Sequence, residues 1–240
     1  MSTATLIIAR RVLQQIRRDR RTLALLVILP AILMSLLALI YSGTQMFDRI
    51  APSLFALFPF TVMFLVTSVA TLRERTSGTL ERTLSMPVHR IDFIGGYSLA
   101  FAVLSIVQTI VSATVVLWLL GLAIEGSLWQ FFAVSLIDAL AGTALGLLAS
   151  AFARTEFQAV QFMPAVVFPQ FMLCGLLVPR DQLPTVLEKI SDVLPLSYAV
   201  DAIKKVSAGS GSIGTDMLVL LAFLVVFLAL AAVSMRRRTA

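Results

Sequence analysis

The chain has 240 residues, 59% of them apolar and 13% charged, with a mean hydropathy of +0.96, which excludes a soluble globular domain. Its net charge of +6 lies mostly in arginines that flank apolar runs, which is typical of a membrane protein and not of a nucleic-acid-binding protein. The single Cys174 excludes an intrachain disulfide and a cysteine-rich metal site.

Residues 5–21, ahead of the first apolar run, predict a basic amphipathic helix that lies on the inner leaflet. Its apolar face would carry Leu6, Ala9, Leu13 and Ile16, and its polar face Arg10, Gln14, Arg17 and Arg21. Anchoring to anionic lipid accounts for this pattern, and contact with a cytosolic partner is the alternative.

Six apolar runs of about twenty residues match a hydrocarbon core of about 30 Å, crossed at about 1.5 Å per helical residue. We expect an all-α membrane protein with transmembrane helices at about residues 23–42, 52–72, 97–122, 129–152, 158–178 and 215–235. Because arginines gather at one side of these runs, both termini are expected in the cytoplasm, and residues 1–240 form a single multi-pass domain.

The polar segment between spans two and three is helix-prone and ends at Pro87. It predicts a short cytosolic helix at residues 79–86, which is marginal alone in water and needs a partner surface or the span ends to hold it. A polar loop lying on the lipid headgroups is the alternative.

Span four contains a carboxylate near the bilayer midplane, Asp138, and two glycines at a small-xxx-small spacing, Gly142 and Gly146. A charge at that depth costs about 2.5–3.5 kcal/mol, so Asp138 should face protein or water. It either contacts substrate or a proton, or makes a structural hydrogen bond to another span, for which Gln108 is a candidate.

Aromatic and methionine side chains in spans two and five predict an adaptable surface for flat aromatic molecules, with packing against lipid as the alternative. With the buried polar groups, the candidate translocation path is Phe55, Phe58, Gln108, Asp138, Gln161, Phe168, Phe171 and Met172.

Residues 179–206 predict an external re-entrant hairpin of two short amphipathic helices before the last span. Apolar residues at Leu183, Val186, Leu187 and Ile190 follow helical spacing, and Pro184 and Pro195 bound that piece.

Enzymatic motifs are missing from the sequence. There is no G-x-x-x-x-G-K-[ST] loop for ATP, no H-E-x-x-H motif, and the sole histidine, His89, lies in the loop after span two. We therefore expect neither an enzyme nor a bound cofactor or metal.

Three motifs resemble those of the permease subunits of type-2 ABC transporters, and they cover nearly the whole chain. The first is E-x-x-x-G-T-L-E-x-x-L-x-x-P, matched by Glu74, Gly78, Thr79, Leu80, Glu81, Leu84 and Pro87. The others are an R-D-R-like run at Arg18, Asp19 and Arg20 with Pro30 behind it, and a late signature at Gly175, Pro179, Leu183, Pro184, Pro195, Leu196, Ser197, Tyr198 and Ala199. Tyr97 departs from the family, in which many members have lysine. Chain size and arginine-rich ends look most like actinobacterial drug-export permeases, including the daunorubicin and fluoroquinolone types.

The resemblance implies a function and partners. Two copies of a separate ATP-binding subunit would bind ATP and grip the coupling helix, through Arg82 as well as the motif residues Glu74, Gly78, Thr79, Leu80, Glu81, Leu84 and Pro87. A second permease chain, identical or homologous, would complete the path in the cytoplasmic membrane, and the hairpin would gate its outer mouth at Pro179, Pro184, Pro195 and Tyr198. The expected cargo is amphipathic small molecules such as drugs or antibiotics.

Three alternatives remain open from the sequence. The permease could export a lipid or polysaccharide instead of drugs, or the chain could be an ion-coupled secondary transporter centred on Asp138. It could also be a structural or sensory membrane protein whose cytosolic helix only recruits a partner.

Overall fold

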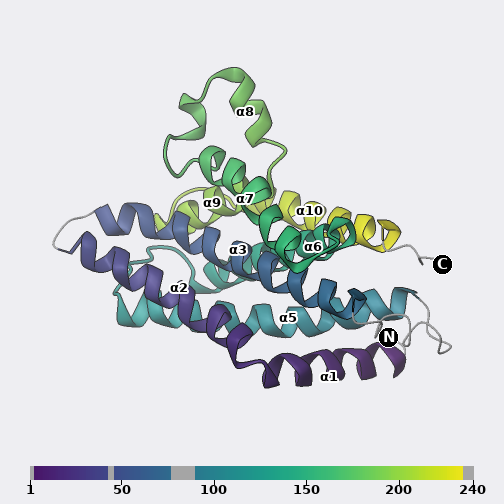
Figure 1. Cartoon of the computed structure of the whole chain (residues 1–240). Coiled ribbons are helices and arrows are strands. Elements are labelled where there is room, and N and C mark those ends of the chain that lie inside the picture. The colour runs from purple at the N-terminus through teal and green to yellow at the C-terminus, as the bar shows by residue number, and fades with distance from the viewer. Residues whose placement is uncertain (1–2, 43–45, 77–89, 235–240) are drawn as a thin grey trace.

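A computed structural model describes residues 3–42, 46–76 and 90–234, and every regular element in these ranges is helical (Figure 1). The helices are α1 (Thr3–Arg18), α2 (Arg20–Ile40), α3 (Met46–Thr76), α5 (Arg90–Thr114), α6 (Leu128–Phe152), α7 (Glu156–Leu173), α8 (Thr185–Ser191), α9 (Pro195–Ser207) and α10 (Gly214–Ser234). A π-helix, η1 (Val115–Leu119), extends α5, and a 3-10 turn, η2 (Arg180–Gln182), precedes α8.

Five of the described helices are long and apolar enough to cross a membrane, at Thr22–Ile40, Met46–Thr76, Ile94–Leu119, Leu128–Phe152 and Gly214–Ser234. These correspond to five of the six predicted spans. The remaining span, predicted at 158–178, is a helix only from Glu156 to Leu173 and is not among the five. The coupling helix predicted at 79–86 lies outside the described residues.

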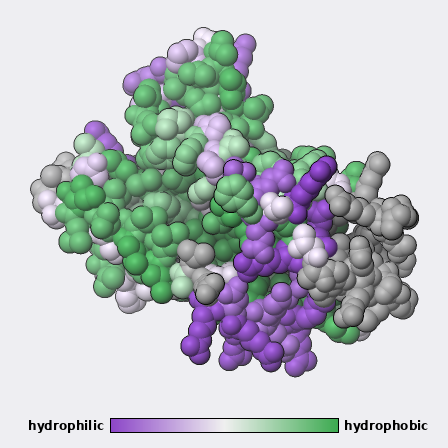
Figure 2. All heavy atoms as spheres, viewed as in Figure 1, coloured by the Kyte–Doolittle hydropathy of each residue, from purple (hydrophilic) through white to green (hydrophobic). Residues whose placement is uncertain are grey.

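The outward faces of α2 and α10 are apolar and uncovered within the chain, as expected for helices that face lipid. Only 19% of the α2 window and 11% of the α10 window are buried. Figure 2 shows an apolar surface over most of the bundle, with hydrophilic residues gathered at one end and at the tip of the hairpin. The chain is therefore a multi-pass membrane protein.

The centre of the bundle is the contact between α3 and α6, the most extensive in the structure. A Cβ atom on Gly142 would lie 2.3 Å from the carbonyl oxygen of Phe60, and one on Gly146 would lie 2.5 Å from that of Phe64. The two glycines thus let the α6 backbone approach the α3 backbone, which confirms the close contact that their spacing predicts.

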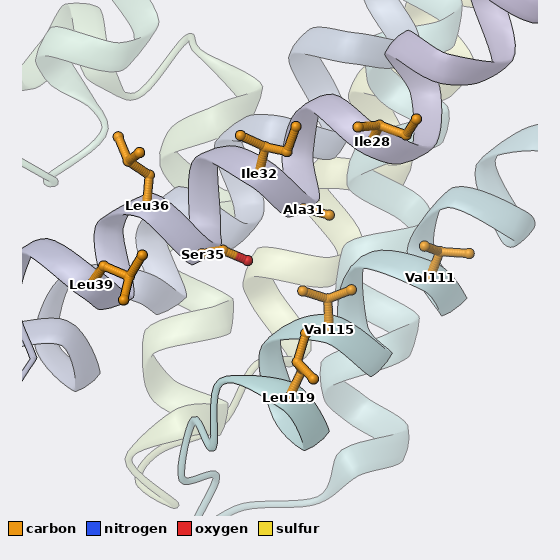
Figure 3. A pocket seen from close by; sticks show the side chains of 9 residues that line it. All are labelled: Ile28, Ala31, Ile32, Ser35, Leu36, Leu39, Val111, Val115 and Leu119. Atoms are coloured by element: carbon orange, nitrogen blue, oxygen red, sulfur yellow. The ribbon is translucent and has the colours of Figure 1, made fainter.

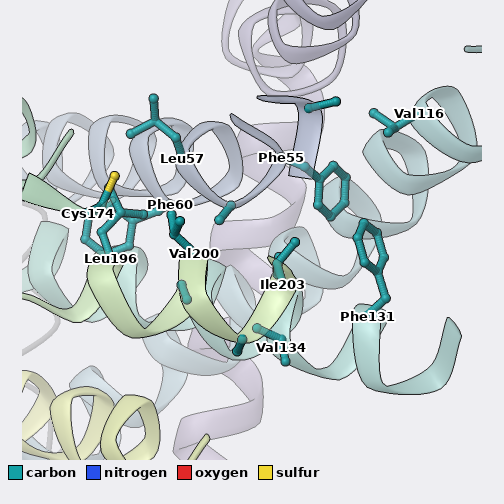
Figure 4. Packing of buried hydrophobic residues seen from close by; sticks show 14 of the residues in the cluster. Phe55, Leu57, Phe60, Val116, Phe131, Val134, Cys174, Leu196, Val200 and Ile203 are labelled. Carbon is teal, nitrogen blue, oxygen red and sulfur yellow. The ribbon is translucent and has the colours of Figure 1, made fainter. Parts of the chain in front are cut away.

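The outer part of this contact is filled by aromatic and branched side chains. The rings of Phe55 and Phe131 stack with their centroids 4.6 Å apart (Figure 4). From α9, Leu196, Val200 and Ile203 are fully buried in the same cluster, so α9 closes this end of the core. The exposed α8 stands away from the bundle (Figure 1).

Helix α1 differs from its prediction in extent and in the face that it buries. It ends at Arg18, because Asp19 accepts hydrogen bonds from the backbone and hydroxyl of Thr22 and starts α2. Its buried residues are Thr5, Ile8, Ala9, Val12 and Ile16, whereas Leu6 is 52% exposed. This face packs on α5. It shares only Ala9 and Ile16 with the predicted apolar face, so the prediction of that face was partly wrong.

Gly96 makes the contact between α1 and α5 possible. A Cβ atom there would lie 2.6 Å from Cγ2 of Ile8 and 3.0 Å from the Thr5 carbonyl oxygen, whereas at Gly95 the nearest atom is 3.4 Å away. Of these two neighbouring glycines, only Gly96 therefore requires the absence of a side chain.

Candidate functional site

The last turn of α3 leads directly into the predicted coupling segment, and its charged residues bond to other helices. We call the end of the bundle where α3 ends and α5 begins the inner end, following the predicted orientation. Of the residues predicted to couple to an ATPase, only Glu74 is described; Gly78, Thr79, Leu80, Glu81, Arg82, Leu84 and Pro87 lie outside the described residues.

Glu74 is 5% exposed and faces the interior of the protein. Its Oε2 accepts a 2.6 Å hydrogen bond from Nη2 of Arg11 on α1. The same nitrogen lies 3.5 Å from the hydroxyl of Tyr97 on α5. The position of Glu74 therefore suits it to fix the end of α3 against α1 and α5, and not to contact a partner directly.

The two arginines that flank Glu74 connect α3 to three further points. Arg73 donates to both carboxylate oxygens of Glu156, at 2.8 and 2.9 Å, and lies 3.4 Å from Asp19. The hydrogen bond from Arg73 lowers the pKa of Glu156 below its ordinary value. Arg75 donates to the backbone carbonyl of Ser150 near the end of α6.

Residues 73–75 thus join α3 to α1, α6 and α7 immediately before the coupling segment, and Arg11 extends these bonds to α5. We call this set of bonds, made by Arg11, Arg73, Glu74 and Arg75, the inner clasp. Sequence reasoning found Glu74 but missed the three arginines, because basic residues at span ends are common for topological reasons alone. A displacement of the coupling segment would reach four helices through the inner clasp.

The predicted path residues are not brought together within the described part of the chain. Phe55 packs in the core against Phe131, and Phe58 and Phe171 are partly buried. Gln161 is exposed on α7, as are Phe168 (57%) and Met172 (51%). The predicted path therefore divides into an interior group and a group on the outside of α7.

Gln108 and Asp138 belong to the interior group, and both are fully buried. Among the described residues, no hydrogen bond reaches any side-chain nitrogen or oxygen of either residue, so the bond considered between them is not formed. A nearby link between α5 and α6 comes instead from Ser105 and Thr143, whose hydroxyls lie 3.4 Å apart.

A groove of about 430 Å³ lies between α2 and the end of α5, and none of the predicted path residues lines it. Its walls are aliphatic except for Ser35 (Figure 3): Ile28, Ala31, Ile32, Leu36, Leu39, Val111, Val115 and Leu119. Apart from the hydroxyl of Ser35, this lining offers neither charge nor hydrogen bonds to orient a polar cargo.

At the outer end, Arg180 organises the hairpin that sequence reasoning assigned as a gate. It donates to Ser191 Oγ at 2.8 Å, to Asp201 at 2.5 Å and to Asp192 at 2.5 Å. Its guanidinium carbon lies 5.3 Å from the centroid of the Tyr198 ring. We call these five residues the outer hub.

The outer hub connects η2, α8 and α9 with the end of α7. Ser191 Oγ donates to the carbonyl of Leu173, and the hydroxyl of Tyr198 donates to the carbonyl of Asp192 at 2.8 Å. Burial raises the pKa of Asp201 above its ordinary value although Arg180 is bound to it. The sequence offers no signal for this role of Arg180, because its partners are 11 to 21 residues away, at the end of α8 and in α9.

The four predicted gate residues have separate places around the outer hub. Pro179 and Pro184 are exposed and precede η2 and α8, where they start each helix. Pro195 is buried as the first residue of α9, and Tyr198 is half-buried in the hub itself.

Comparison with known proteins gives a consistent family. A family model described as "ABC-2 type transporter" matches residues 3–207. "ABC transporter G family member 20" of Dictyostelium discoideum is 28% identical over 68% of this chain and 22% of the relative. "Probable multidrug ABC transporter permease YbhS" of Escherichia coli is 27% identical over 72% and 47%, and "Linearmycin resistance permease protein LnrN" of Bacillus subtilis is 27% identical over 71% and 44%. The matched region spans about half or less of the length of these relatives.

Proposed function

Because this chain belongs to the ABC-2 type transporter family, we propose that it is the membrane permease subunit of an ATP-driven exporter. Its cargo would be amphipathic small molecules, drugs or antibiotics, moved out across the cytoplasmic membrane. The match of the family over residues 3–207 is the observation that carries the proposal. The names of two relatives, a multidrug permease and a linearmycin resistance permease, support the class of cargo.

In this proposal, ATP is bound and hydrolysed by two copies of a separate subunit. Each copy grips a coupling helix at residues 79–86, and both termini of the permease are cytoplasmic. The inner clasp supports a transmission role for α3, because residues 73–75 bond to α1, α6 and α7 directly beside that segment. Closure of the ATP-binding subunits would then displace these helices together.

A second permease chain, identical or homologous, would complete the translocation path. The support is the uncovered face of α7, where Gln161, Phe168 and Met172 are exposed within a single chain. In this arrangement α7 is the sixth membrane-crossing helix, and a neighbouring chain covers its polar positions. The hairpin of η2, α8 and α9, fixed by the outer hub, would gate the outer mouth.

Reconstituted vesicles test the function. The chain and the ATP-binding subunit are placed together in liposomes, and flux of a fluorescent amphipathic drug is measured with and without ATP. The proposal predicts flux that needs ATP, the ATP-binding subunit and this chain together. Flux driven by an ion gradient in the absence of ATP would instead indicate a secondary transporter, and absence of any flux with all components present would point to a structural or sensory role.

A further inference from the structure

Asp138 lies inside the contact between α3 and α6. Phe131 and Gly142 lie on the same face of α6 as Asp138, because they are seven residues before it and four residues after it. Both touch α3: Phe131 stacks on Phe55, and Gly142 lies against the carbonyl of Phe60. Asp138 is therefore bracketed along the helix by two close contacts, and its exposed fraction is 0%.

The α3 residue at the level of Asp138 is apolar. The pairs Phe60 with Gly142 and Phe64 with Gly146 show that the two helices run in the same direction. One turn before Phe60, at the level of Asp138, the residue is the fully buried Ala56. A methyl group leaves room for the carboxyl group but supplies no hydrogen-bond donor.

No donor among the described residues reaches either carboxylate oxygen of Asp138. Titratable residues on the elements packed against α6 lie toward the ends of the bundle; those described are Asp48, Arg49, Arg73, Glu74, Arg75, Asp92, Tyr97, Glu156, Tyr198, Asp201, Lys204, Lys205 and Asp216. The cations nearest α9 have other partners, since Lys204 donates to the Gly175 carbonyl and Lys205 to Asp216. No cation in the described part of the chain therefore balances a charge on Asp138.

An ionised carboxylate in such a place lacks both solvent and a counter-charge and is strongly destabilised, whereas a neutral acid loses far less on burial. We propose that Asp138 is a proton-binding site, neutral while the contact between α3 and α6 is closed and ionised when that contact opens to water. Because α3 continues into the predicted coupling segment, a displacement of α3 against α6 would release the proton. This proton-binding site is formed by one chain alone, so it can be tested independently of the export function.

Infrared spectroscopy of the full chain in liposomes of uncharged lipid tests the proposal. Aspartate carboxyl groups carry ¹³C, so that the C=O stretch of a protonated aspartic acid is separated from that of glutamic acid. At neutral pH the wild type should show a protonated-aspartate band that is absent from Asp138→Asn. Asp216→Asn, which removes a carboxylate paired with Lys205, should retain the band.

Two results would overturn the proposal: no protonated-aspartate band in the wild type at neutral pH, or a band that persists in Asp138→Asn. If Asp138→Asn does not fold, Asp138→Glu serves instead, because it moves the acid from the labelled to the unlabelled region of the spectrum. Gly142→Leu, which forces α3 and α6 apart, should abolish the band by admitting water, and retention of the band in that variant would contradict the coupling to helix separation.

Discussion

Arg11 and Glu74 join the first helix of the chain to the last turn of α3 through a hydrogen bond of 2.6 Å between Nη2 and Oε2. The carboxylate is almost fully buried, whereas the arginine side chain is 37% exposed. Glu74 is also the first residue of the motif that continues into the coupling segment. The pair therefore holds α1 and the start of that segment in a fixed relation.

Glu74→Gln should weaken both the fold and coupling, because the buried end of the pair loses its charge. A hydrogen bond to a charged group contributes about 1.5–3 kcal/mol, and we expect a loss of that size in the free energy of unfolding. Arg11→Glu combined with Glu74→Arg should recover part of it. Thermal unfolding of the wild type, Arg11→Glu, Glu74→Arg and the double variant measures the coupling energy, and a double variant no more stable than the worse single variant would contradict the direct pairing.

Gly96→Ala should displace α1 from α5, because the new methyl group would meet Ile8 and the Thr5 backbone. Overpacking of this kind costs about 1–3 kcal/mol. Gly95→Ala is the matched control, since its nearest atom lies at an ordinary 3.4 Å. Proteolysis within α1 should be faster in the first variant only, and equal rates in both would show that α1 is not seated on Gly96.

Gly142→Ala should destabilise the contact between α3 and α6 by a similar amount, about 1–3 kcal/mol, because the α3 backbone has to move. Gly214→Ala, at the start of α10, has its nearest atom at 3.5 Å and provides the control. Unfolding in detergent measures both variants. An unchanged midpoint for Gly142→Ala would mean that the two backbones are not in close contact.

Arg180→Lys should loosen the outer hairpin although it keeps the charge, because an ammonium group cannot reproduce the forked bonds to Ser191, Asp192 and Asp201. Hydrogen exchange in α8 should accelerate by about tenfold or more, which corresponds to about 1.4 kcal/mol. Lys189→Gln, at an exposed position on α8, should leave the exchange unchanged. Equal protection from hydrogen exchange in Arg180→Lys and the wild type would show that the outer hub does not stabilise this hairpin.

The periodicity of apolar residues predicted most of the helices, because long apolar runs leave a membrane chain few other structures. The spacing of Gly142 and Gly146 predicted a backbone contact that the structure confirms. The extent of α7 was overestimated: the helix ends at Leu173, before Gly175, whose φ of +84° ends regular helix.

The sequence did not predict which residues from different helices contact each other. The buried face of α1 differs from the predicted one because packing against α5 determines which side chains are covered. The amphipathic pattern of α1 alone does not specify this packing. The bonds of Arg11, Arg73 and Arg180 join residues that are 11 to 86 positions apart, and no local pattern specifies them. The proposed path was not confirmed as one site, since its residues divide between the core and the outside of α7.

Reversing or introducing a charge in the coupling segment is predicted to uncouple transport without unfolding the protein. Glu81→Arg or Leu84→Asp should each reduce ATP-dependent export by about tenfold or more, equivalent to about 1.4 kcal/mol of lost coupling. Thermal unfolding should be unchanged, because in the proposed function these two side chains contact the ATP-binding subunit. Normal export together with normal co-purification of the ATP-binding subunit would refute the docking role.

Site-specific crosslinking tests the central claim, that an ATP-binding subunit grips residues 79–86, most directly. A photo-reactive residue is placed in turn at Thr79, Thr83 and Ser85, and native membranes that contain both subunits are irradiated during transport. The account predicts an adduct between this chain and the ATP-binding subunit from at least one of these positions. Membranes that transport drug but yield no such adduct from any of the three would contradict it.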